Sequence, residues 1–280
     1  MQKRFKIALL ITGASLLMSL FGQVALGTPV MASVDDKSLT WKLSWADEFN
    51  GANGAPVNSS KWEFDTGGKW GNGTELQYYT DRTANASQLG GNLVITATKE
   101  SYGGNAYTSA RVKTYTKFSQ TYGRFEARVI VPTGQGIWPA FWILGNDIYT
   151  SGWPKCGEVD LMEHVNNETR FVGSVHMPST VASEYKTGTN FDTSSDPSFY
   201  TKYHVYAVEW EPTTIRYYVD NLLYKTVNKA QLPVGAVWVF DHPFYIILNV
   251  AVGGNWPGSP DSTTVWPARM VVDYVRVYSR

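Results

Sequence analysis

Short segments of alternating or β-branched sequence recur along this chain, and none of it keeps helical periodicity beyond about three turns. Clusters of Gly, Pro, Asn and Asp separate these segments, a pattern typical of strands joined by tight turns. The predicted strands span residues 92–98, 122–131, 171–176, 203–210, 214–219, 244–250 and 270–278. Roughly a dozen strands cannot form one flat sheet without exposing an apolar face. We therefore expect an all-β domain of two packed antiparallel sheets, a sandwich or jelly roll.

Two local patterns support this fold class. In residues 125–129, strict alternation places Phe125, Ala127 and Val129 on one face and two charged residues on the other. Asp220 and Asn221 lie between two apolar segments, which predicts a two-residue hairpin turn.

The overall charge excludes one class of function. The chain has 24 Lys and Arg against 24 Asp and Glu, so it lacks the basic excess that nucleic-acid binding requires. Hydrophobic residues make up 43% and charged residues only 17%, which excludes a disordered chain. Because Cys156 is the one cysteine, no intrachain disulfide can form, so an exported protein would depend on a large core and any bound ion.

The first 32 residues have the layout of a secretory signal peptide. Lys3, Arg4 and Lys6 precede an apolar stretch at about residues 7–26, and Val30 and Ala32 suit cleavage before Ser33. Cleavage after Gly27 is an alternative, and a membrane anchor is disfavoured because polar and small residues interrupt the apolar stretch. We expect a secreted, extracellular protein whose domain spans residues 33–280, with no membrane association after cleavage.

The densest chemical signal is the run GEVDLMEH at residues 157–164. In a strand, Glu158 and Asp160 point to the same face, whereas plain alternation sends Glu163 to the opposite one. A one-residue bulge at Leu161–Met162 would return Glu163 to the shared face. The chemical interpretation therefore requires that bulge.

Three carboxylates on one strand face repel one another and raise one another's pKa. Glycoside hydrolysis uses such a group, because one carboxylate must be ionised to attack the sugar while another holds a proton for the leaving oxygen. The alternatives are a solvated strand face or a Ca²⁺ site. Trp-rich flanking segments disfavour the first, and calcium more often uses Asp/Asn-rich loops with a glycine turn.

Aromatic residues gather near this run in the sequence. Trp138 and Trp142, four positions apart, share a strand face, and Trp153 and Trp256 lie in turn-rich segments. Indole rings pack against the C–H faces of sugars, so Trp residues around acids indicate a sugar groove, although Trp on core strands such as Trp210 is expected to be buried.

The four histidines show no zinc-ligand spacing. His176 could border the acids and bind a sugar hydroxyl, or could simply be packed. Cys156 is expected to be a small packed residue, because no partner that would activate a thiol can be named.

The chain resembles glycoside hydrolase family 16, in its laminarinase-type branch. The pattern Glu158-x-Asp160-x-x-Glu163 is similar to the bulged active-site signature of that branch. Further matching segments are WADEFNG (45–51), GNGTELQYY (71–79), SAR (109–111), YGRFE (122–126), GIWPAFW (136–142), FDHPF (240–244), GGNWPG (253–258) and VDYVRVY (272–278). Together these segments are specific for endo-1,3-β-glucanases.

The resemblance implies a concanavalin-like jelly roll with the substrate cleft on its concave face. It implies that Glu158 is the nucleophile, that Glu163 is the general acid/base and that Asp160 assists Glu158. The residues that would line the sugar subsites are Asn72, Arg111, Trp138, Trp142, His176 and Trp256. His164 departs from relatives that have an aromatic residue there, which leaves the preference of the neighbouring subsite open.

Many family members hold a structural Ca²⁺ on the convex side. The matching positions here are Glu48, the Gly91 carbonyl and Asp273. That ion would tie the first and last strands together, and no organic cofactor is expected.

These observations lead us to expect a retaining endo-β-1,3-glucanase that acts as a monomer on β-1,3-glucan. A glucan-binding module without catalysis would keep the Trp groove but would need no acid pair. The same chemistry on mixed-linkage β-1,3-1,4-glucan, agarose or carrageenan is a closer rival. A sulfated substrate would favour a basic cleft, which the zero net charge does not indicate.

Overall fold

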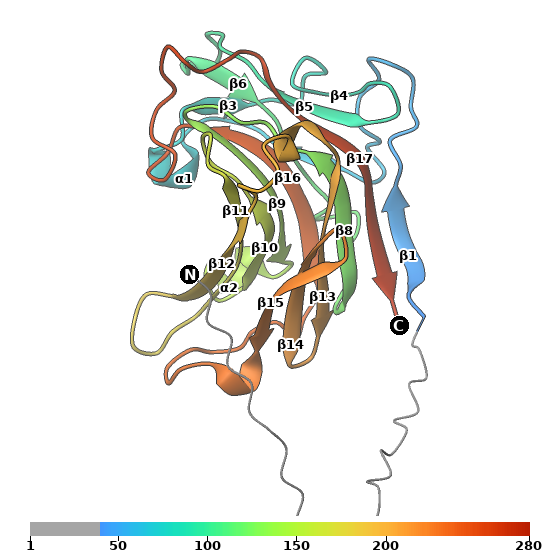
Figure 1. Ribbon diagram of the computed structural model, residues 1–280, viewed down its shortest axis with the longest axis vertical. Helices are drawn as coiled ribbons and strands as arrows, with labels where there is room; N and C mark the ends of the chain where they lie inside the picture. Colours follow the sequence, from blue (N-terminus) through green and yellow to red (C-terminus); the bar gives the residue numbers. More distant parts are fainter. Residues whose placement is uncertain (1–39) are drawn as a thin grey trace, which may run out of the picture. The chain divides into compact units, whose positions relative to one another are not determined.

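The computed structural model describes residues 40–280, which form two antiparallel sheets packed face to face (Figure 1). The predicted signal peptide at residues 1–32 and its cleavage site lie outside the described residues. Between residues 40 and 280, no helix is long and apolar enough to cross a membrane. The predicted all-β jelly-roll sandwich is confirmed.

The first sheet, here called the front sheet, has seven strands and carries the acidic run. Its strands, in spatial order, are β12 (Tyr185–Asp192), β11 (Arg170–Met177), β10 (Glu158–Glu163), β9 (Ile137–Gly145), β16 (Phe244–Val252), β7 (Arg111–Lys113) and β2 (Glu63–Asp65). The long strands of this sheet curve, with the hollow side turned away from the other sheet (Figure 1). The acidic strand β10 therefore lies inside the sheet, flanked by β9 and β11.

The second sheet, the back sheet, has eight strands. Seven follow the order β15 (Leu222–Asn228), β14 (Thr214–Val219), β13 (His204–Glu211), β8 (Gly123–Ile130), β17 (Ala268–Ser279), β5 (Leu93–Ala97) and β4 (Ala86–Gln88), and β1 (Lys42–Asp47) also pairs with β17. A small parallel pair joins β3 (Gln77–Tyr79) to β6 (Tyr107–Ser109). The helical elements are single turns: α1 (Trp70–Gly73), α2 (Ile148–Ser151), η1 (Phe199–Thr201) and η2 (Lys229–Gln231).

The core lies between the two sheets. Phe125, Ala127 and Val129 of β8 are completely buried, as their alternation predicts. Trp210 is buried too, with its ring centroid 5.0 Å from that of Phe244 and 6.1 Å from that of Phe125. Burying a side chain such as Phe125 or Val129 stabilises the fold by about 1.5–3 kcal/mol relative to leaving it exposed. Packing of this kind holds the front sheet in the shape that the acids require.

The predicted strands agree with the observed ones to within about two residues. Asp220 and Asn221 form the predicted hairpin turn between β14 and β15, both with positive φ (48° and 66°). Strand β12 was not predicted. Its polar sequence YKTGTNFD lies at the edge of the front sheet, where alternate residues are exposed and no apolar pattern is needed.

Candidate active site

The acidic strand contains the irregularity that its spacing predicts. Pairing of β10 with both neighbouring strands shifts by one position between Asp160 and Glu163. Leu161 and Met162, the two residues in between, are both buried in the core between the sheets. This bulge returns Glu163 to the face that carries Glu158.

A pocket of about 330 Å³ opens on that face of the front sheet. All three acids line it, together with three indoles and a guanidinium. The lining residues are Gly71, Glu75, Tyr79, Arg111, Trp138, Ala140, Trp142, Trp153, Glu158, Asp160, Glu163, Asn249 and Ala251. The arrangement combines carboxylates with broad apolar walls, which suits a ligand that has both C–H faces and hydroxyls.

Glu158, the first residue of β10, has a hydrogen-bond donor and a histidine ring as neighbours. The Trp153 indole donates from Nε1 to Oε2 at 3.1 Å, and His176 Nε2 lies 3.8 Å from Oε1. Burial and the charge of Asp160 raise the pKa of Glu158 to about 8, while the charge of His176 and the Trp153 bond oppose this rise. The neighbouring cation and donor thus favour the ionised form of a carboxyl that burial alone would protonate.

Glu163, at the other end of β10, has a different environment. Its Oε1 accepts a hydrogen bond from Trp138 Nε1 at 3.0 Å. Burial, and then the charges of Asp160 and Glu158, raise its pKa well above the ordinary value, with smaller opposition from His176 and Trp138. Burial and the two neighbouring anions therefore favour the protonated form of Glu163, the form that a general acid needs.

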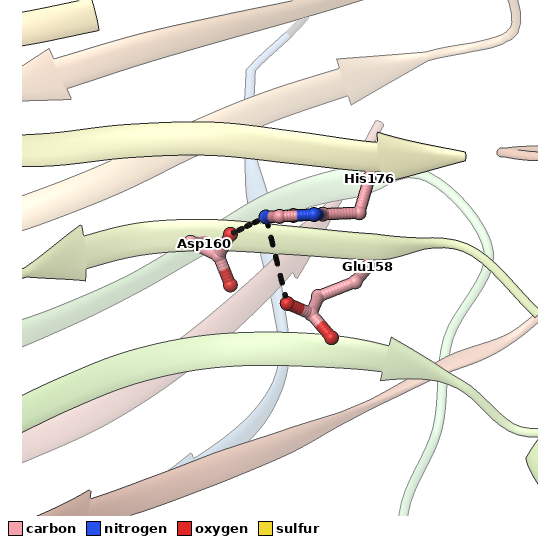
Figure 2. A group of neighbouring side chains, drawn as sticks. All are labelled: Glu158, Asp160 and His176. Atoms are coloured by element: carbon pink, nitrogen blue, oxygen red, sulfur yellow. Dashed lines mark ion pairs between the residues drawn. The ribbon is translucent and has the colours of Figure 1, made fainter. Parts of the chain in front are cut away.

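Asp160 lies between these two acids and is 2% exposed. The Ser174 hydroxyl, directly across on β11, donates to its Oδ2. His176 Nε2 lies 3.3 Å from the same oxygen (Figure 2). These contacts fix Asp160 between the other two carboxylates, where its charge acts on both.

His176 is the cation nearest to the acids and does not line the pocket itself. Burial lowers its pKa, but the hydrogen bond and charge of Asp160, the charge of Glu158 and the bond to Glu184 raise it, to about 10. Glu158, Asp160 and His176 place three potential metal-ligand atoms within 4.8 Å of one another. Because a protonated Nε2 has no lone pair for a metal, the group forms an ion-pair cluster.

Arg111 lines the opposite wall and is held from three sides. Its guanidinium carbon lies 4.8 Å from the Trp70 ring centroid and 4.7 Å from that of Trp142, and its Nε pairs with Asp65 at 2.9 Å. The Trp142 indole in turn donates to Asn249 Oδ1 at 2.8 Å. These contacts give Trp142 a fixed orientation against the pocket.

Two of the predicted subsite residues lie at the rim. Asn72 is exposed in α1, beside the lining residue Gly71, with a positive φ of 57°. Trp256 is 41% exposed, and its ring meets that of Trp138 edge-on at 5.5 Å. The predicted subsite residues thus divide between the wall (Arg111, Trp138 and Trp142), the rim (Asn72 and Trp256) and the ion-pair cluster (His176).

Several residues around the pocket were not predicted. Glu75 and Tyr79 fall inside a segment that the resemblance quotes, but nothing in their spacing indicates a role. Asn249 is the lone polar residue of the buried strand β16, and that isolation is a usable signal. Glu184, in the segment just before β12, has no signal in the sequence at all.

Two residues next to the acids face the interior. His164 is 1% exposed, with Nδ1 3.0 Å from the Arg170 carbonyl oxygen and its ring 4.2 Å from that of Tyr200. It points away from the pocket, so it does not shape a subsite directly. Cys156 is completely buried, and burial raises the pKa of its thiol to about 12, as expected for a packed residue.

The predicted calcium positions border a break in the strand pairing along one edge of β17. Strand β5 pairs with that edge as far as Val272, and β1 begins to pair at Val275, so Asp273 lies in the gap. Glu48 follows β1 directly, and residue 91 precedes β5 by two positions. Both carboxylates face arginines: Glu48 pairs with Arg276 through two bonds of 2.8 Å, and Asp273 with Arg128 at 2.5 Å.

Comparison with known proteins agrees with this geometry. Residues 72–276 match the family described as "Glycosyl hydrolases family 16". The chain is 46% identical over 254 residues to a beta-glucanase of Rhodothermus marinus, covering 87% of each chain.

Solved structures give the same result. The endo-beta-1,3-glucanase of Pyrococcus furiosus is similar with a TM-score of 0.77 and 44% identity, over 85% of this chain and 94% of that one. The laminarinase catalytic domain of Thermotoga maritima is similar with a TM-score of 0.76 and 43% identity, over 86% and 98%. The chain therefore belongs to glycosyl hydrolase family 16.

Proposed function

We propose that this glycoside hydrolase is a secreted, retaining endo-β-1,3-glucanase. A Glu158 oxygen attacks the anomeric carbon while Glu163 gives its proton to the departing glycosidic oxygen, which breaks the sugar–sugar bond and leaves a glycosyl ester on Glu158. Glu163, now ionised, takes a proton from water, and the resulting hydroxide releases the sugar and restores the Glu158 carboxylate.

One observation carries this mechanism. Glu158 and Glu163 line the same pocket on either side of Asp160, and although burial raises the pKa of both, a cation and an indole donor lie against Glu158. The His176 charge and the Trp153 hydrogen bond lower the pKa of Glu158 against this rise, whereas the charges of both Asp160 and Glu158 raise the pKa of Glu163 further. A pair of this kind can supply a nucleophile and a proton donor at the same pH.

The substrate is proposed from the pocket walls and from the relatives. Trp138, Trp142 and Trp153 offer apolar faces for pyranose rings, and the zero net charge gives no attraction for a sulfated polymer. The similar proteins named above are a beta-glucanase, an endo-beta-1,3-glucanase and a laminarinase. These features together favour β-1,3-glucan.

Product analysis on laminarin, barley mixed-linkage glucan and agarose, run side by side, tests this proposal. We expect short oligosaccharides from laminarin, weaker release from the mixed-linkage glucan and none from agarose. NMR of the first products should show the β-anomer, because double displacement retains configuration. Faster cleavage of agarose, or an initial α-anomer, would contradict the proposal.

N-terminal sequencing of protein recovered from a bacterial host's medium checks export, with Ser33 as the expected first residue.

We further propose a structural Ca²⁺ held by Glu48, the Gly91 carbonyl and Asp273. The proposal is supported by the hard oxygen donors that these three positions offer beside the gap along β17. Binding would exchange the two arginine pairs for coordination to the ion. The bound ion would join the chain near β1 to the last strand.

Calcium at about 100 times its Kd would stabilise the fold by about 2.7 kcal/mol, which is roughly 5–10 °C in Tm for a domain of this size. Thermal melting with and without chelator measures this shift. Asp273→Asn should abolish the calcium-dependent shift in Tm. The control Asp241→Asn changes the net charge equally at an exposed carboxylate and should keep the shift. Identical melts, with no metal found by elemental analysis, would remove the site.

A further inference from the structure

His176 presents both of its ring nitrogens to carboxylates from different parts of the chain. Its Nε2 lies 3.3 Å from Asp160 Oδ2 and 3.8 Å from Glu158 Oε1, and Figure 2 draws both ion pairs. On the other side of the ring, Nδ1 lies 3.1 Å from Glu184 Oε2. The imidazole thus connects the acids of the pocket to a carboxylate behind them.

This geometry determines how many protons the ring carries. A neutral imidazole has one N–H, so one of its nitrogens would direct a lone pair at a carboxylate. A doubly protonated ring directs one N–H at Glu184 and the other toward Asp160, with Glu158 3.8 Å away. The pKa of His176, raised to about 10, agrees with this state. The two contacts and the raised pKa together favour the imidazolium form of His176 at neutral pH.

The other groups around His176 cannot replace Glu184. Lys186, its cross-strand neighbour on β12, is exposed and positive, so it weakly opposes protonation through solvent. The Trp153 ring lies 5.9 Å from the imidazole, and Ser174 Oγ lies 3.4 Å from Nε2, but neither is charged. On the Nδ1 side, Glu184 supplies the counter-charge.

We propose that Glu184 is a positioning residue: it holds His176 as an imidazolium ion and thereby favours the ionised form of Glu158, which attacks the sugar. The inference rests on the proposed glycosidase function and extends it. Glu184 is absent from the pocket lining and has no hydrogen bond to Glu158 or Glu163, so it acts through the ring.

The physical reason is the balance of charge in the pocket. Three carboxylates lie close together, and the imidazolium is the cation in contact with two of them. If the ring lost its proton, Glu158 and Asp160 would be adjacent anions without a counterion, and one of them would take up a proton. A protonated Glu158 cannot attack the anomeric carbon.

The direct test follows the His176 imidazole by NMR as the pH is raised, in wild-type protein and in Glu184→Gln. We expect the titration midpoint to fall by about 1–3 pH units in the variant, the usual effect of one opposite charge at this distance. A spectrum of His176→Gln assigns the signal among the four histidines. An unchanged midpoint would overturn the proposal. Because no substrate is present, this result is independent of the proposed function.

Matched variants separate this effect from a structural one. Glu184→Asp keeps the charge, so its titration midpoint should lie close to the wild-type pH. Glu168→Gln removes an acid that pairs with Arg170 outside this cluster, and it should leave the His176 midpoint unchanged. An equal shift in Glu168→Gln would overturn the proposal. If Glu184→Gln fails to fold, Glu184→Ala removes the same charge and should lower the midpoint in the same way; an unchanged midpoint there would overturn the proposal.

Kinetics provide a second readout. In Glu184→Gln, kcat/KM should decline at lower pH than in wild type, because the ring loses its proton earlier. In a His176→Gln background the same change should have no further effect on the pH profile. An equal effect in both backgrounds would overturn the inference. If wild type cleaves no β-1,3-glucan but the midpoint still moves, the proposed function fails and the coupling between Glu184 and His176 stands.

Discussion

Glu158→Gln is expected to lower kcat on laminarin by about 10⁴-fold or more, since losing a covalent nucleophile removes the main reaction path. Gln keeps the shape of Glu158 and can still accept the Trp153 hydrogen bond, but it cannot form the glycosyl ester. The change also removes one of three mutually repelling acids, so folding should be unharmed. Steady-state kinetics and a laminarin-binding measurement check both expectations.

The matched control is Glu168→Gln, the same substitution at an acid outside the pocket, which should keep wild-type activity.

A variant with a smaller side chain, Glu158→Gly, allows a chemical test of the nucleophile assignment. Azide can occupy the space of the missing carboxylate and attack an activated aryl β-glycoside in one displacement, giving the α-glycosyl azide. Near-wild-type kcat in Glu158→Gln, or a β-azide from Glu158→Gly, would mean that Glu158 is not the nucleophile.

Glu163→Gln should lower kcat/KM on laminarin by about 10²–10⁴-fold, the usual contribution of general acid–base catalysis. The loss should be much smaller on aryl glycosides with nitrophenol leaving groups, because such a leaving group departs without a proton. Comparison of the two substrates isolates the proton-transfer role from any general damage to the site.

The pH dependence of the same variant follows from the raised pKa of Glu163. The acid works only when protonated, so wild-type activity is present below this pKa and is lost as the pH rises through it. Glutamine does not titrate, so the alkaline decline due to Glu163 should vanish. Equal losses on both substrates, or an unchanged alkaline decline, would contradict the assignment.

The acid cluster could be predicted from the sequence because alternation along a strand is a local rule. Six residues, Glu158 to Glu163, are enough to show that the last acid needs a bulge to join the others. The burial of Phe125 and the turn at Asp220 follow from rules of the same short range. The alternating strand β8 and the strongly apolar strand β16 were predictable for this reason.

The role of Glu184 and the orientation of His164 could not be predicted, because they depend on contacts between distant segments. Glu184 reaches His176 because β11 and β12 are antiparallel neighbours, and nothing in the sequence of the polar edge strand β12 indicates that pairing. His164 follows Glu163 directly and so seemed able to influence a subsite. It points into the interior because strand geometry directs it there, where the Arg170 carbonyl and the Tyr200 ring bind it.

By itself, the sequence determined the all-β class, the strand that carries the acids and the need for an irregularity in it, because each depends on side-chain periodicity within a few residues. The tertiary structure alone decided how strongly each acid holds a proton, because burial and the neighbouring charges set that affinity. Those charges come from β10, β11 and the segment before β12, and only the folded sheets bring them within a few ångströms of one another.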